Sequence, residues 1–162
     1  MTGAADHWLY RLDAESWLQA ASAELASGEA RVDSRRTAVT HARRAAGMAL
    51  NAVLVALGAA TGDREAAAAR WGRSYIDHLR ALRDDASLAT TELSPEAAAT
   101  AAALLEISPL GAGGSGLVQL TTSARRPAAQ ALDLARDLCR ACEGSVRALS
   151  GSAAAPAERE AE

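Results

Sequence analysis

The three histidines and 17 arginines of this chain are the residues best suited to acid–base chemistry on a phosphate. A histidine moves a proton near neutral pH, and an arginine holds a phosphate through two parallel hydrogen bonds.

The spacing between arginine and histidine gives three candidate pairs. An arginine precedes a histidine by five or six residues at Arg73 to His78 and at Arg35 or Arg36 to His41. Five residues advance about 140° on a helix, so Arg36 and His41 would face apart. Arg73 lies just before an expected helix start and can turn toward the histidine, so Arg73 and His78 are the predicted catalytic pair. With arginine at about one residue in ten, roughly one such match is expected by chance, so the pattern alone is weak.

A basic patch is expected on the segment that carries Arg35, Arg36, Arg43 and Arg44. Arg36 and Arg43 are seven residues apart, so they share one helix face and are the predicted contacts to a nucleotide or RNA. The alternative, which we favour, is a solvated face whose arginines pair with acids such as Glu24 and Asp33.

The two cysteines, Cys139 and Cys142, form a Cys-x-x-Cys pair. A redox motif of this kind follows a strand, and a zinc site needs four ligands, but this pair lies inside an expected helix with no second ligand pair. We therefore expect a structural role for both thiols, and neither a metal nor a cofactor.

The composition describes one domain with a modest net charge. The chain has 162 residues, of which 49% are hydrophobic, and a net charge of −3. That charge excludes a global basic field for non-specific nucleic-acid binding. No signal peptide is evident, and the longest apolar run, over residues 52–60, is too short to span a bilayer. We therefore expect a cytoplasmic protein that does not bind a membrane.

Apolar residues recur at helical spacing almost throughout. They predict helices over residues 13–27, 34–58, 74–84, 94–107 and 127–149, with a further helical segment over 64–71. Gly28 is expected to end the first helix in the left-handed conformation, and Pro127 to begin the last one. The central helix should bury Val39, Ala42, Ala46, Ala49, Val53 and Leu57. The fold class is thus an all-α, up-and-down bundle of about five helices over residues 1–149, followed by a disordered tail over 150–162.

The helical patterns resemble those of the HEPN (higher eukaryote and prokaryote nucleotide-binding) family. The family's first helix carries Trp-Leu followed by spaced small and apolar residues, which matches Trp17-Leu18-Gln19-Ala20 and then Glu24-Leu25. Its second helix has a His-Ala-x-x-Ala-Ala-x-x-Ala-Leu-x-Ala pattern, matched from His41 to Ala52. A later His-Leu followed by Leu matches His78, Leu79 and Leu82.

The resemblance implies a HEPN-like bundle and a homodimer. Trp8, Tyr10 and Trp71 are candidates for its interface, but packing within the bundle is the role that we favour for each. Active members of the family are metal-independent RNases with an arginine and a histidine in a later region, where this chain has Arg125 and Arg126 but no histidine. The expected function is therefore a non-catalytic module that binds a protein partner or a nucleotide. The alternatives are an RNase toxin, paired with a nucleotidyltransferase-like antitoxin as the resemblance implies, and a structural helical adaptor.

Overall fold

The computed structural model describes residues 7–69, 74–85, 93–110 and 122–154. Within these residues the protein is all-helical, with no strand, which confirms the predicted fold class. The elements are the 3₁₀-helix η2 (Trp8–Arg11) and the α-helices α1 (Ala14–Glu29), α2 (Arg35–Thr61), α3 (Arg64–Ala69), α4 (Tyr75–Asp84), α6 (Pro95–Glu106) and α7 (Thr122–Ala154). Six α-helices are thus described: the five expected ones and α3, which lies in the further helical segment expected over residues 64–71.

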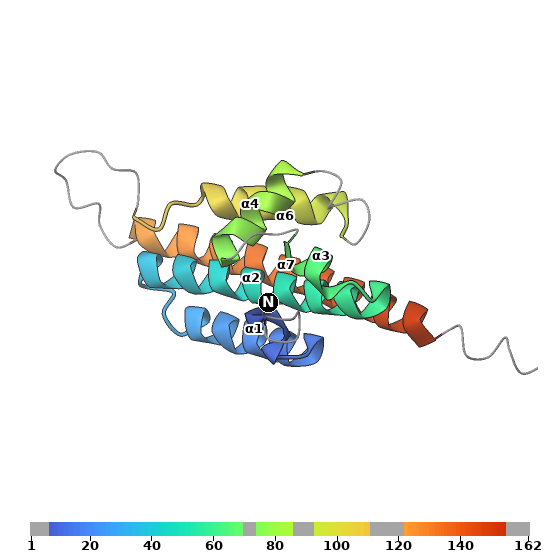
Figure 1. The fold of residues 1–162 in the computed structure, drawn as a ribbon. Helices are drawn as coiled ribbons and strands as arrows, with labels where there is room; N and C mark the ends of the chain where they lie inside the picture. Colours follow the sequence, from blue (N-terminus) through green and yellow to red (C-terminus); the bar gives the residue numbers. More distant parts are fainter. Residues whose placement is uncertain (1–6, 70–73, 86–92, 111–121, 155–162) are drawn as a thin grey trace, which may run out of the picture.

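Helices α1, α2 and α7 run side by side, and the shorter α4 and α6 cover the other side of α2 and α7 (Figure 1). Helix α2 is central because it contacts α1, α3, α4 and α7. Every position of its predicted apolar stripe is buried: Val39, Ala42, Ala46, Ala49, Val53 and Leu57. The side chains of the alanines on this helix are small, so the neighbouring helices pack close to its backbone.

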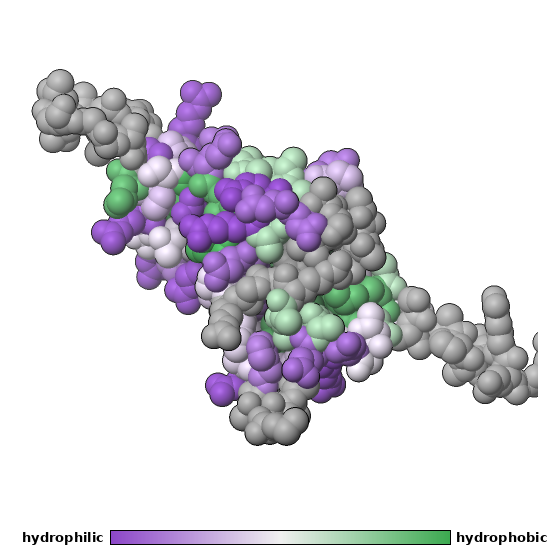
Figure 2. Space-filling view, turned by 45° about the horizontal axis from the view of Figure 1, so that its top comes forward, coloured by the Kyte–Doolittle hydropathy of each residue, from purple (hydrophilic) through white to green (hydrophobic). Residues whose placement is uncertain are grey.

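Helix α2 is also the one described helix long and apolar enough to cross a membrane by length and composition. Of its most apolar window, 67% is buried inside the protein. This burial is the pattern of a central bundle helix. On the face drawn in Figure 2, hydrophilic side chains alternate with smaller apolar areas.

Most helix starts follow the expected capping chemistry. The carboxylate of Asp13 accepts a hydrogen bond from the backbone N–H of Ser16 at 2.7 Å, and Ser74 accepts one from the N–H of Asp77 at 3.2 Å. Ser94 precedes Pro95 at the start of α6, as predicted. These side chains satisfy backbone donors that have no partner inside the helix.

Gly28 was predicted as a left-handed helix end, and this is wrong. Gly28 lies within α1 and is buried, and among the described residues the only positive φ belongs to Gly62, at 73°. A Cβ on Gly28 would lie 2.7 Å from Leu132 Cδ2 and 3.0 Å from His41 Cβ. The missing side chain therefore serves the close packing of α1 against α2 and α7.

The boundaries of α7 also differ from the prediction. The helix begins at Thr122, so Pro127 lies within it and does not start it. It also continues to Ala154, five residues into the expected tail, while residues 155–162 lie outside the described part of the chain. Proline is favoured in a first turn, where its missing N–H has no partner, whereas inside a helix, as at Pro127, it loses one backbone hydrogen bond and its ring crowds the preceding turn.

Candidate functional site: a groove at the end of the bundle

The predicted catalytic pair is described only in part. Arg73 lies outside the described residues, as does Trp71. His78 lies on α4 and is only 1% exposed. Its ring lies nearly parallel to that of Trp8, at 15° with centroids 6.4 Å apart. Trp8 in turn meets Trp17 edge to face at 6.1 Å, so His78 belongs to a packed aromatic cluster between η2, α1 and α4.

A second buried polar residue, Asn51, lies on α2. Its side chain is fully buried, and neither atom of its amide has a hydrogen-bond partner in the described protein. Leaving a buried polar group unpaired costs about 1–3 kcal/mol. The buried amide of Asn51 is therefore expected to lower the stability of the core. In the sequence, the only sign of this residue was that the single Asn of the chain lies inside an apolar run.

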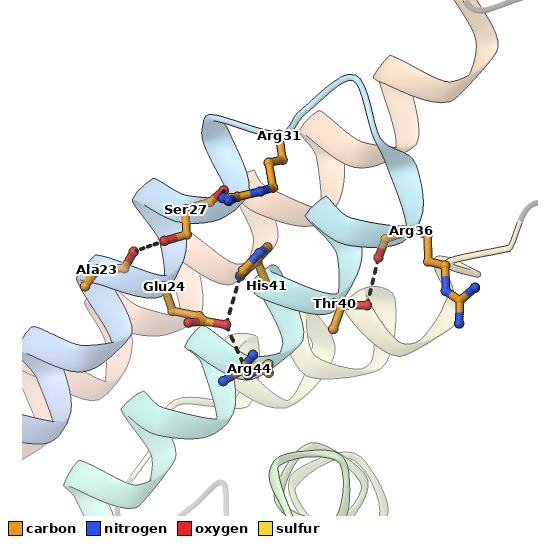
Figure 3. Close-up of polar contacts among 8 residues, drawn as sticks. All are labelled: Ala23, Glu24, Ser27, Arg31, Arg36, Thr40, His41 and Arg44. Carbon is orange, nitrogen blue, oxygen red and sulfur yellow. Dashed lines mark hydrogen bonds and ion pairs between the residues drawn. The ribbon is translucent and has the colours of Figure 1, made fainter.

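His41 belongs to a polar cluster between α1 and α2 (Figure 3). One carboxylate oxygen of Glu24, Oε1, lies 2.9 Å from Nδ1 of His41 and 3.1 Å from Nε of Arg44. The side chains of Glu24 and His41 are largely buried, at 14% and 18% exposure, and Arg44 covers them from outside at 49%. This cluster joins two helices, and the pairing of a basic-patch arginine with Glu24 was predicted.

The two arginines predicted to bind a nucleotide have different environments. Arg36 is exposed, and its side chain points away from the Glu24 cluster (Figure 3). Arg43 is half-buried, and its guanidinium donates to the backbone carbonyls of Leu105 and Ile107 at 2.8 and 3.0 Å. Burial lowers the pKa of Arg43, and the nearby charge of Arg80 lowers it further.

Arg43 and Arg35 together close the end of α6. Nε of Arg35 donates to the carbonyl of Ser108 at 2.8 Å, next to the two carbonyls held by Arg43. The last carbonyls of a helix have no partner inside it, and cations are favoured there. Arg35 and Arg43 thus bind backbone carbonyls of the protein itself, while Arg36 is exposed. The contact to a nucleotide or RNA expected for Arg36 and Arg43 stays a prediction.

The two thiols are held inside the bundle. Burial raises the pKa of Cys139 to about 12, and its Sγ lies 3.8 Å from the carbonyl oxygen of Ala45. Burial also raises the pKa of Cys142 well above its ordinary value. Neither is a ready nucleophile, since the thiolate is the reactive form. Among the described residues, no group of three or more His, Cys, Asp and Glu side chains could hold a metal ion.

A pocket of about 500 Å³ lies where η2, the end of α2 and the end of α7 meet, and we call it the end groove. Its lining is Tyr10, Leu12, Asp13, Ala14, Val55, Ala56, Ala59, Ala60, Arg64, Leu149 and Ser150. The alanines and aliphatic side chains make most of this lining apolar. Asp13 and Arg64 provide one negative and one positive charge.

Tyr10 and Arg64 shape one wall of the end groove. The Tyr10 hydroxyl donates to the carbonyl of Arg64 at 2.6 Å, and the guanidinium carbon of Arg64 lies 5.2 Å from the centroid of the Tyr10 ring. Burial raises the pKa of Tyr10, so the hydroxyl stays a protonated donor. A Cβ on Gly58 would lie 2.6 Å from this hydroxyl, so a glycine there makes the contact possible.

Sequence reasoning gave Tyr10 two possible roles, packing across the bundle end, which was favoured, and contact with a partner, and it missed the rest of the end groove. The lining comes from residues 10–14, 55–64 and 149–150, which are far apart in the chain. The only local signal was the short helical repeat of alanines near the end of α2.

Comparison with models of known protein families, with curated proteins and with solved structures finds no match to this chain. The HEPN resemblance therefore stays a prediction.

Proposed function

We propose that this chain is a non-catalytic helical binding module, of the HEPN type, that binds a protein partner through the end groove. The observation that carries the proposal is the end groove itself. It is a pocket of about 500 Å³ with a mostly apolar lining that includes one acidic and one basic side chain. Concave apolar surfaces with a few placed polar groups are typical of binding sites.

The chemistry of the end groove favours a protein over a nucleotide. Nucleic-acid affinity comes mainly from several cations on phosphates, whereas Arg64 is the one basic residue in the lining of the end groove, which also includes the carboxylate of Asp13. Protein interfaces combine an apolar centre with a polar rim, which is the arrangement of this lining.

The surroundings of His41 on α2 and His78 on α4 support a protein that is not a catalyst. His78 is buried against Trp8, and His41 is paired with Glu24. A general acid or base must come within hydrogen-bond distance of its substrate, and a side chain 1% exposed does not meet that condition. The RNase alternative therefore needs α4 to move.

A photo-cross-linking residue at position 12, inside the end groove, tests the proposal in cells that make the protein. The matched control places the same residue at position 110, because Leu12 and Leu110 are the two exposed large apolar side chains of the described chain. We expect a discrete protein cross-link at position 12 that is absent at position 110 and lost when Ala59→Trp fills the groove.

Three results would contradict the proposal. The first is no cross-link above the control, and the second is a nuclease-sensitive cross-link, which would indicate a nucleic-acid ligand. The third is metal-independent cleavage of a mixed RNA pool by the parent protein that His78→Ala abolishes, which would support the RNase alternative. The homodimer and the cytoplasmic location expected from the sequence stay predictions.

A further inference from the structure

We propose that the end of the bundle opposite the end groove docks on an anionic lipid surface. This end, which we call the arginine end, is where α1 and α6 end and α2 and α7 begin, at the left in Figure 1. Its arginines bind lipid phosphates, and Leu110 enters the apolar layer below them. The inference goes beyond the proposed function, because it concerns a second surface and a different kind of partner.

Contacts between distant segments bring them together at the arginine end. Nε of Arg35, at the start of α2, donates to the carbonyl of Ser108, after the end of α6, at 2.8 Å. Nε of Arg125, near the start of α7, lies 3.3 Å from a carboxylate oxygen of Asp33, in the turn between α1 and α2. All four helices therefore contribute to one surface.

Positive charge is in excess at the arginine end. The described charged residues there are five arginines and three acids: Glu29, Arg31, Asp33, Arg35, Arg36, Glu106, Arg125 and Arg126. Two of the acids are already paired, Glu29 with Arg136 and Asp33 with Arg125. The whole chain carries a net charge of −3, so this end has the opposite sign to the protein as a whole.

Three of these arginines keep their charge available to an anion. Arg31, Arg36 and Arg126 are exposed, and none of them forms an ion pair within the part of the chain that the structure describes. A guanidinium binds a phosphate through two parallel hydrogen bonds, and each arginine near an anionic membrane adds to the attraction.

An exposed apolar side chain lies beside the arginines. Leu110 is 76% exposed, the most exposed large apolar side chain of the described residues. Its backbone N–H donates to Oγ of Ser108 at 3.3 Å, and Arg35 binds the carbonyl of the same serine. A single exposed leucine is ordinary on a protein surface, but next to several cations it supplies the second of the two signals that hold a protein on a membrane.

This combination favours a lipid surface over a nucleic acid. Nucleic-acid binding depends on phosphates and base edges, and a leucine at the level of the phosphates gains little there. In a bilayer, an apolar layer begins about 5–10 Å below the headgroups, so the arginines and Leu110 find their partners together. The expectation that the chain does not bind a membrane came from apolar runs too short to cross one, and that argument does not concern docking on its surface.

Docking by the arginine end leaves the end groove accessible. Helix α2 begins at Arg35 and reaches the end groove at Val55. At 1.5 Å per residue these positions are about 30 Å apart, so a protein bound in the end groove is held about that far from the lipid headgroups.

Co-sedimentation of the full chain with vesicles tests the proposal. The probe is a phosphatidylcholine vesicle with about 30% phosphatidylglycerol at about 0.1 M salt, and the reference is phosphatidylcholine alone. We expect binding to the anionic vesicle to be at least about tenfold tighter. Reversing the three available charges together, with Arg31→Glu, Arg36→Glu and Arg126→Glu, should remove this preference while circular dichroism shows unchanged helix content.

The matched control reverses three exposed arginines elsewhere, with Arg11→Glu, Arg140→Glu and Arg147→Glu. It changes the net charge equally and should lower the affinity far less. Leu110→Ser should weaken binding about tenfold, because one leucine no longer enters the apolar layer, whereas Leu12→Ser in the end groove should not.

Three results would overturn the proposal: no preference for the anionic vesicle, equal losses in the two triple variants, or equal effects at positions 110 and 12. If the chain binds double-stranded RNA and not the vesicles, and the variant of Arg31, Arg36 and Arg126 is defective, the ligand is a nucleic acid and the proposal is wrong. None of these outcomes depends on the end groove, so the cross-link at position 12 tests the proposed function separately.

Discussion

Replacing Gly47 with alanine tests the contact that holds α4 on the central helix. A Cβ on Gly47 would lie 2.6 Å from Cδ1 and 2.8 Å from the backbone Cα of Tyr75, and closer still to Tyr75 Cβ. The obstruction includes backbone, so a rotamer change in Tyr75 cannot relieve it and α4 must move away from α2.

The expected magnitude combines two opposing effects. Overpacking of this kind costs about 1–3 kcal/mol. Alanine is a better helix former than glycine by about 1 kcal/mol, which offsets part of that cost. Gly47→Ala should therefore lower the free energy of unfolding by up to about 2 kcal/mol.

Gly144→Ala is the matched control, because Gly144 is exposed in the interior of α7 and a Cβ there would have no atom within 4 Å. This variant has only the helix-propensity effect and should gain about 0.5–1 kcal/mol. Urea unfolding followed by circular dichroism at 222 nm measures both changes. If Gly47→Ala were as stable as Gly144→Ala, α4 would not contact α2 at Gly47, and the reasoning would be refuted.

Three further predictions concern the core. Ala46→Glu should leave the chain unfolded at room temperature, because it buries an unpaired charge at a position with no exposed surface; a cooperative melt within a few degrees of the parent would contradict this. Asn51→Leu should raise the free energy of unfolding by about 1–2 kcal/mol, since it removes an amide without a partner, whereas a loss measured by urea unfolding would mean that the amide is satisfied. Iodoacetamide should modify Cys139 and Cys142 far more slowly in the folded protein than in urea, up to about pH 10, because both pKa values are raised and both thiols stay protonated; equal rates at pH 8 would refute it.

The helices and the core could be predicted from the sequence because their signals are local. Asp13, Ser74 and Ser94 each cap the helix that follows, and each of the six α2 positions that the apolar spacing identified is buried. These features depend on residues three or four apart, so a single chain segment contains all the information.

The prediction for Gly28 was wrong because one residue type can serve more than one structural role. A glycine can adopt a left-handed helix end or permit a close contact, and Gly28 does the second because Leu132, more than 100 residues later, packs against it. The partners of Arg43 could not be predicted either, because the two carbonyls that its guanidinium binds lie 62 and 64 residues away in the chain. The end groove is assembled from three distant segments, so no local pattern could predict it.

Photo-cross-linking from position 12 tests the central claim most directly, that the end groove is a protein-binding surface. We predict a discrete cross-linked protein at position 12 in cells that make the chain, which is absent at position 110 and is lost when Ala59→Trp fills the groove. Equal cross-linking at the two positions, or a cross-link that nuclease treatment removes, would contradict the account.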